Sequence, residues 1–219
     1  KTMVHCNGKS GRLGGGGVEE AQTVEQTADG GYIMGGITDS YGAGSTDLLA
    51  VKLDAAGNVS WAKAFGSPGF DSYPSLYSSS DGGYILLYID GTVGGLNVAK
   101  INSAGTIVWS RLISGAGYSS TNFAGSGPMI TETSGGYVMW MGGGWGSYSF
   151  YRFDNSGNVV ASKTSGLVNS NHIFYSTLPT PDGGYIITGL VCCSDLVVIK
   201  LDRCGDRVWA KSYSGAGVD

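Results

Sequence analysis

Residues 29–36 read DGGYIMGG, and this stretch decides the fold because the chain repeats it. Further copies begin at Asp81 (DGGYILLY) and Asp182 (DGGYIITG), and a divergent copy, SGGYVMWM, begins at Ser134. The four tyrosines are spaced 52, 53 and 48 residues apart, and they are Tyr32, Tyr84, Tyr137 and Tyr185. A steady period of this length indicates a repeat architecture.

A second motif follows each copy of the first. It reads VKLDAAGNVSWAK from Val51, AKINSAGTIVWSR from Ala99, YRFDNSGNVVASK from Tyr151 and IKLDRCGDRVWAK from Ile199. A tryptophan recurs in three copies, as Trp61, Trp109 and Trp209, and Ala161 replaces it in the third copy. Because a tryptophan buries ~150–250 Å² and its N–H needs a partner, we predict that these rings pack between neighbouring units.

Each unit holds four short segments with strand character. In the first unit they cover residues 21–27, 31–37, 47–53 and 58–65, and they either alternate apolar with polar residues or form short apolar runs. Gly30 and Gly57 provide the positive φ that tight hairpin turns require. Four-stranded antiparallel units at this period are typical of a β-propeller.

We therefore predict an all-β chain that forms a four-bladed β-propeller of four-stranded antiparallel blades, with a short N-terminal extension. Residues 1–17 are the Gly-rich extension and residues 18–219 the propeller, with blades at about 18–66, 67–115, 116–166 and 167–219. The chain stops at Val218 and Asp219, in the phase in which Val18 and Glu19 open the first unit. This match of phase predicts a complete ring.

The two motifs resemble those of secreted bacterial and archaeal propeller repeats of the DGGYI…KLDxxGNxxWxK type, and the resemblance covers residues 18–219. The tryptophan-docking repeats of quinoprotein dehydrogenases are more distantly similar, through KLDAAGNVSWAK. The resemblance implies the fold and export. It implies no activity, and because nothing matches a quinone site we expect no cofactor. Ser134 and Ala161 depart from the pattern, which predicts different packing of the third blade.

Composition narrows the classes of partner and location. The net charge is −4 and no basic run occurs, so we expect no nucleic acid and no anionic membrane surface as partner. No apolar stretch approaches the roughly 18 residues of a membrane span. Four cysteines in a chain poor in charge and rich in Gly indicate an extracellular or cell-surface location, and their spacing fits no zinc motif: Cys6, Cys192, Cys193 and Cys204.

The cysteine pairing is constrained by the expected strand 195–201. Such a strand is roughly 23 Å long, whereas a disulfide needs Cα atoms within about 7 Å. Cys204 is therefore not expected to pair with Cys192 or Cys193 inside one blade. One expected bond joins Cys6 to a cysteine of blade four. A strained bond between Cys192 and Cys193, or a bond to a neighbouring subunit, remains open for the others.

Catalytic motifs are missing from the sequence. No GxSxG or HExxH occurs, and Gly8-Lys9-Ser10 lacks the upstream glycine of a P-loop. Recurrent aspartates could ligate calcium. Such residues more often accept hydrogen bonds from turn amides, so we predict no metal site at them: Asp47, Asp54, Asp154, Asp195 and Asp202.

Aromatic residues of the third unit break the repeat. Trp145 and Tyr148 are candidates for stacking on sugar rings or anchoring a protein partner, whereas Trp140 and Phe150 are assigned to the interblade core. We predict a non-catalytic extracellular structural or interaction module, such as a self-assembling surface or filament subunit. It is not expected to be an enzyme, and its expected partner is itself or another surface protein. The alternatives are a lectin-like propeller that binds glycans and a hydrolase with an acid pair at the axis.

Overall fold

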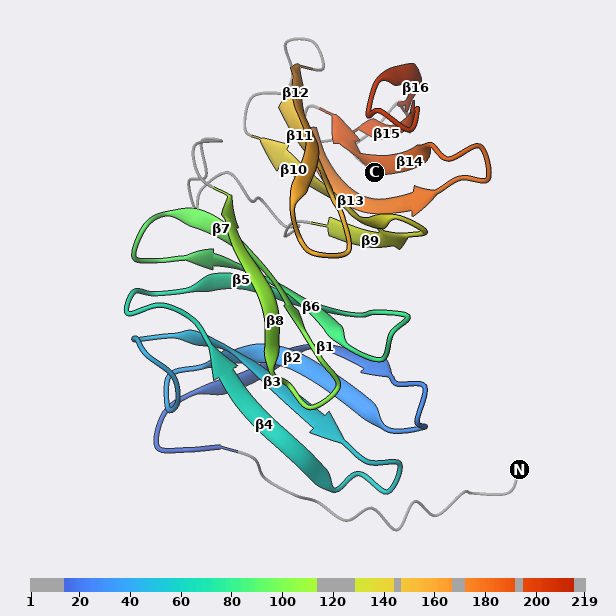
Figure 1. The fold of residues 1–219 in the computed structure, drawn as a ribbon. Helices are drawn as coiled ribbons and strands as arrows, with labels where there is room; N and C mark the ends of the chain where they lie inside the picture. The colour runs from blue at the N-terminus through green and yellow to red at the C-terminus, as the bar shows by residue number, and fades with distance from the viewer. Residues whose placement is uncertain (1–13, 114–128, 144–146, 167–171, 192–194, 215–219) are drawn as a thin grey trace, which may run out of the picture.

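The computed structural model describes residues 14–113, 129–143, 147–166, 172–191 and 195–214. These residues form sixteen β-strands in four antiparallel four-stranded sheets, with the strands of each sheet in sequence order, and no helix occurs among them (Figure 1). The prediction of an all-β, four-bladed propeller is confirmed. The described part of the chain contains no helix long and apolar enough to cross a membrane.

Each sheet is one blade. Blade one consists of β1 (Glu19–Gln26), β2 (Tyr32–Thr38), β3 (Asp47–Leu53) and β4 (Val59–Phe65). Blade two consists of β5 (Ser72–Ser78), β6 (Tyr84–Asp90), β7 (Gly95–Ile101) and β8 (Ile107–Ile113). Blade three consists of β9 (Met129–Thr133), β10 (Gly136–Gly143), β11 (Ser147–Phe153) and β12 (Val159–Gly166). Blade four consists of β13 (His172–Pro179), β14 (Tyr185–Val191), β15 (Asp195–Leu201) and β16 (Arg207–Tyr213).

The repeated DGGY stretch forms the hairpin between the first two strands of a blade. Gln26 pairs with Tyr32 across this turn in blade one, and Gly30 has a φ of 79°, which a residue with a side chain rarely adopts. In blade three the turn is shorter, because Thr133 pairs directly with Gly136. The divergent third copy therefore has a different hairpin.

Aromatic side chains join consecutive blades. The Trp61 ring lies 6.2 Å from that of Tyr84, and the Trp109 ring lies 6.0 Å from that of Tyr137. Blade three has Ala161 instead of a tryptophan, and here Trp140 packs 5.3 Å from Tyr185 of blade four. Trp140 and Phe150 are each 1% exposed, so they fill the interblade core as expected.

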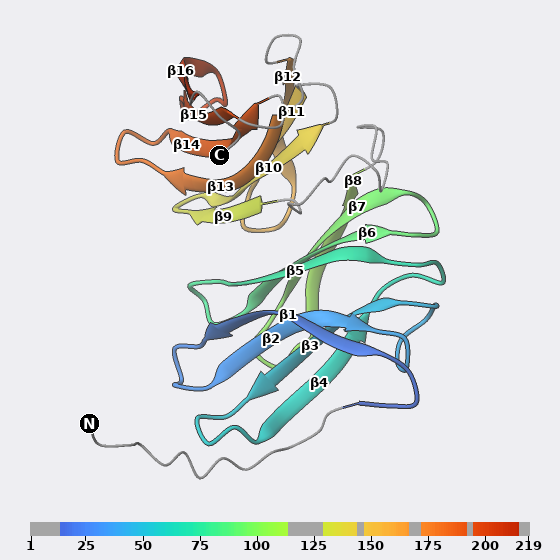
Figure 2. The same cartoon turned by 180° about the vertical axis from the view of Figure 1, so that it is seen from behind.

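The four blades form an arc. The first strands contact each other where blade one meets blade two, β1 with β5, and where blade three meets blade four, β9 with β13, which places them on the inner side of the arc. Blades one and four lie at opposite ends of the arrangement in both views (Figures 1 and 2). The complete ring expected from the phase of the chain is thus not formed by the described residues. Closure depends on the angle between blades, and the phase of the repeat does not specify that angle.

Candidate functional site

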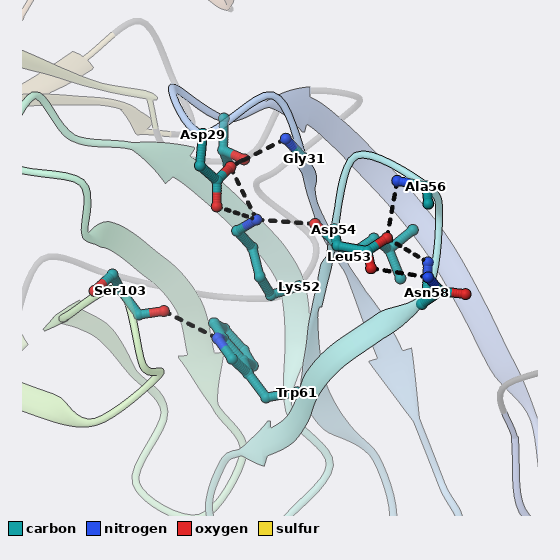
Figure 3. Close-up of polar contacts among 10 residues, drawn as sticks. Asp29, Gly31, Lys52, Leu53, Asp54, Ala56, Asn58, Trp61 and Ser103 are labelled. Atoms are coloured by element: carbon teal, nitrogen blue, oxygen red, sulfur yellow. Dashed lines mark hydrogen bonds and ion pairs between the residues drawn. The ribbon is translucent and has the colours of Figure 1, made fainter.

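The aspartate of the DGGY stretch is held by a lysine of the second motif in the same blade. The Lys52 ammonium lies 2.9 Å from Asp29 Oδ2 and donates to the Leu53 carbonyl at 2.8 Å (Figure 3). The Lys52 side chain is 7% exposed. The hydroxyl of Thr27 and the Lys52 ammonium hold the pKa of Asp29 well below its usual value. The stretch is thus tied to the end of β3 in the same blade.

The same ion pair recurs in two other blades. Lys100 lies 2.6 Å from Asp81 in blade two, and Lys200 lies 2.8 Å from Asp182 in blade four. In blade three, Ser134 has no carboxylate to offer and Arg152 replaces the lysine. The repeated stretch therefore has a structural role in blades one, two and four. Sequence reasoning missed this pairing, although the joint replacement of Asp and Lys in the third copy signals it.

The aspartates that open the third hairpin of a blade, between its third and fourth strands, cap their own turns. Asp54 Oδ1 accepts hydrogen bonds from the amides of Ala56 and Asn58, at 2.9 and 2.8 Å (Figure 3). Asn102 makes the same contacts in blade two without a charge, so the turn needs no cation. The described residues contain no group of three or more His, Cys, Asp or Glu side chains that could hold a metal ion.

Two buried carboxyl groups meet where blade one joins blade two. Asp47 begins β3 and is 1% exposed, and Asp71 directly precedes β5 and is 2% exposed. Asp71 Oδ1 accepts hydrogen bonds from the Ser67 hydroxyl at 2.7 Å and the Gly91 amide at 2.8 Å. Its Oδ2 accepts one from the Ser67 amide at 2.6 Å. Asp71 is therefore an acceptor at both oxygens, as a carboxylate is.

Asp47 is held on one side only. Its Oδ2 accepts hydrogen bonds from the amides of Ala43 and Gly44, at 3.0 and 3.1 Å. Its Oδ1 is buried and has no hydrogen-bond partner among the described residues. A buried polar oxygen without a partner is costly, and it is uncommon away from functional sites.

Gly66 brings the two carboxyl groups together. A Cβ on Gly66 would lie 1.9 Å from Asp47 Oδ1 and 2.2 Å from Asp71 Oδ2, so only glycine fits between them. The two oxygens can be no farther apart than the sum of these distances. Burial raises the pKa of Asp47, and the charge of Asp71 raises it further. The hydrogen bonds from the Gly44 and Ala43 amides lower it, but the pKa remains above its usual value.

A cavity of about 800 Å³ opens beside this pair. Its lining includes Gln22 of the inner strand β1, the acids Asp71 and Asp90, and the aromatic residues Phe70 and Tyr73. This volume is typical of sites for small molecules. Tyr73 has a φ of 53°, and among the described residues it is the only non-glycine with a positive φ. Backbone strain of this kind concentrates at functional sites.

The charges of Asp71, Asp90 and Asp47 also act on a buried tyrosine. Tyr88 of β6 is 8% exposed, and burial together with the charges of Asp71, Asp90 and Asp47 raises its pKa to about 12. Sequence reasoning found none of the cavity residues as a group. Asp47 was considered only as a calcium ligand or turn acceptor, and the structure shows it accepting turn amides.

Several predicted site residues fall outside the described part of the chain: Trp145, Cys6, Cys192 and Cys193. Tyr148 lies in β11, where it pairs with Gly142. Cys204 is exposed in the hairpin before β16, and the expected disulfides stay predictions because the other cysteines are not described. Cys204 does not line the cavity beside Asp71.

The repeat tyrosines and tryptophans differ by blade. Tyr84, Tyr137 and Tyr185 are 2–5% exposed, whereas Tyr32 in blade one is 37% exposed. Trp109 is 7% exposed and Trp61 is half-buried, whereas Trp209 in blade four is 40% exposed. The unburied members are those at the two ends of the arc.

Comparison with known proteins gives a fold and no family. No protein-family model and no curated protein matches the sequence, so the resemblance to secreted propeller repeats stays a prediction. A protein of unknown function from Bacteroides caccae is similar at a TM-score of 0.51 and 14% identity, over 89% of this chain and 68% of its own. An exo-β-1,3-galactanase from Phanerochaete chrysosporium, solved with β-1,3-galactotriose, is similar at a TM-score of 0.52 and 15% identity. That match covers 91% of this chain and 51% of the galactanase, so this chain spans about half its length.

These comparisons correct two predictions. The prediction of a non-catalytic structural or filament module is contradicted by the likeness to a propeller galactanase, and so is the prediction that the chain is not an enzyme. The structural module was predicted from the regular repeats, the missing catalytic motifs and the placement of the cysteines, and the lack of activity from the missing motifs. The absence of such motifs carries little weight in a propeller, because acids from separate strands and loops can converge, as Asp47 and Asp71 do. The extracellular location and the disulfides stay predictions.

Proposed function

We propose that the chain is a carbohydrate-active hydrolase whose acids are Asp71 and Asp90, with Asp47 behind Asp71. The observation that carries the proposal is the buried contact of Asp47 with Asp71 at a cavity that Asp90 also lines. The similarity in fold to the galactanases supports a glycoside as the substrate class, and it supports no particular sugar.

Glycoside hydrolysis requires one carboxyl group that donates a proton and one that acts as a base or nucleophile. Burial raises the pKa of the Asp47 carboxyl group, and two carboxyl groups this close do not both carry a charge at low cost. Asp71 lines the cavity and is therefore the member of the pair that exchanges a proton with the glycosidic oxygen. Asp47, which does not line the cavity, acts through Asp71 as a positioning residue.

Asp90 supplies the second carboxyl group. Its Oδ1 accepts hydrogen bonds from the amides of Thr92 and Val93, at 2.9 and 3.1 Å, which fixes the side chain in the hairpin after β6. The amide of the next residue, Gly91, donates to Asp71, so the same hairpin places both acids at the cavity. Phe70 is 62% exposed at this cavity and offers an aromatic face for a sugar ring.

The test is hydrolysis of a panel of aryl glycosides and oligosaccharides that includes β-1,3-galactan, with released reducing sugar as the measurement. We expect Asp71→Asn and Asp90→Asn each to lower kcat at least about a hundredfold. Asp154→Asn is the matched control, because Asn102 shows that the same turn accepts an amide. Turnover that is unchanged in Asp71→Asn would overturn the assignment of the acids. Binding of the sugars without turnover by the unmodified chain would favour the lectin-like alternative.

A further inference from the structure

The interface between blades has a donor side and an acceptor side. On the donor side, Trp61 Nε1 donates to the Ser103 carbonyl at 2.9 Å, and the Lys63 ammonium donates to the Ala104 and Gly105 carbonyls at 2.9 and 3.0 Å. The next interface repeats this arrangement: Trp109 donates to the Asn155 carbonyl at 3.2 Å, and Arg111 donates to the Ser156 carbonyl at 3.3 Å. Blades one and two therefore each dock a tryptophan and a basic residue on the third hairpin of the next blade.

Blade four presents a donor side on which no other described residue is docked. Trp209 and Lys211 stand at the positions of Trp61 and Lys63 in the motif. The Lys211 ammonium lies 5.8 Å from the Trp209 ring centre, and that of Lys63 lies 6.0 Å from the Trp61 ring centre. The donor group is thus already arranged. Every residue of β16 is exposed, whereas β8 of blade two is buried at Trp109 and Ile113.

Blade one presents the matching acceptor side, also empty among the described residues. A Cβ on Gly105 would lie 3.1 Å from the Trp61 ring, and one on Gly157 would lie 2.4 Å from the Trp109 ring. A Cβ on Gly57 would have no atom within 4 Å. Tyr32, which corresponds to the tyrosines that receive a tryptophan ring in the next blades, is the exposed member of its set.

We propose that a second copy of this chain binds across these two surfaces. Trp209 of one copy packs on Tyr32 and Gly57 of the other and donates to the Ala55 carbonyl, and Lys211 donates to the carbonyls of Ala56 and Gly57. The partner is assigned by the chain itself, because the donor residues VWAK and the acceptor turn DAAGN repeat the pairing that already joins blades one and two. The proposal is independent of the hydrolase function.

The placement of the two surfaces favours a second copy over closure within one chain. They lie at opposite ends of the arc, so one chain in this conformation does not bring them together (Figures 1 and 2). Two copies related by a twofold axis satisfy both surfaces of each copy at once and leave none open. Such a closed arrangement also ends assembly at the dimer.

Sedimentation of the purified chain tests the stoichiometry. We expect a particle of twice the 22.6 kDa of one chain. We expect Trp209→Ala to raise the dissociation constant at least about tenfold, as for an aromatic anchor at the centre of an interface. Val159→Ala, at an exposed valine of β12, is the control and should leave the constant unchanged. A monomer at every concentration, or an equal constant for Trp209→Ala, would overturn the proposal.

A designed cross-link separates the possible partners of blade four. The chain carrying both Ala56→Cys and Lys211→Cys is treated with a flexible bis-maleimide, which spans roughly the reach of a lysine side chain, and run on a denaturing gel beside the unmodified chain, which shows the background of the native cysteines. A band at twice the chain mass, absent from each single variant, is expected. The pair Lys63→Cys and Ala104→Cys is the matched control and should cross-link within one chain. A cross-link within one chain between positions 56 and 211, or a ladder of bands above the dimer, would refute the twofold dimer.

Discussion

Replacing Trp109 by alanine should destabilise the protein strongly, because this ring connects blades two and three. It is 7% exposed, its ring stacks 6.4 Å from that of Phe153, and its N–H donates to the Asn155 carbonyl. About 200 Å² of buried surface at roughly 25 cal/mol per Å² gives an upper limit near 5 kcal/mol. Measured Trp→Ala costs of about 3–5 kcal/mol agree, so we expect about 4 kcal/mol.

Urea unfolding followed by circular dichroism measures this loss, and thermal unfolding should show a fall in Tm of about 8–16 °C for a chain of this size. Trp109→Phe keeps a ring but removes the N–H donor, so it should cost about 1–2 kcal/mol. Ala161 gives a natural comparison, since alanine at this position is tolerated where Trp140 and Phe150 fill the interface. A loss below about 1 kcal/mol for Trp109→Ala would refute the view that this ring holds the two blades together.

The remaining predictions concern the charged groups. Asp81→Ala should lower the free energy of unfolding in urea by about 2 kcal/mol, because it leaves the Lys100 ammonium, whose side chain is 5% exposed, without its partner. Lys100→Met should cost less, because the Asp81 that it leaves behind is open to water. Equal losses for the two variants would contradict this asymmetry. The pKa of Asp47 is raised in the folded state, so its contribution to stability is present below the pKa of the unfolded chain and lost as pH rises through the folded pKa. Asp47→Asn should therefore stabilise the protein more at pH 7 than at pH 4 relative to the unmodified chain, and the reverse order in urea unfolding would count against the raised pKa.

Much of the fold was predictable because the pattern of each strand recurs in several copies of the repeat. The segment 47–53 coincides with β3, and the segment 21–27 differs from β1 by two residues at its start and one at its end. Alternating side chains and turn glycines are local signals, and they survive in every copy. The assignment of Trp140 and Phe150 to the core also held, since large alternating aromatics in a strand have few other places to go.

The site was not predictable from the sequence, because it depends on distances that no local pattern encodes. Asp47 begins a strand of blade one, and Asp71 precedes the first strand of blade two. Their carboxyl groups meet only because Gly66, which has no side chain, lets the connecting loop pass between them. The open arc is a similar case, since a small change in the angle between sheets decides whether four blades meet. The lysine partners of Asp29, Asp81 and Asp182 could have been predicted from the sequence, because the lysine is replaced in the one copy that lacks the aspartate.

Trp61 and Trp109 each dock on the blade that follows in the chain. This one-way contact affects how such a protein can change in evolution. Duplication of a unit with the motif of blade one or two creates a junction that is already compatible with its neighbour. The junction of blades three and four is different, because its key residues lie on the middle strands β10 and β11. An exchange of blade three or blade four alone would have to preserve the contact of Trp140 with Tyr185.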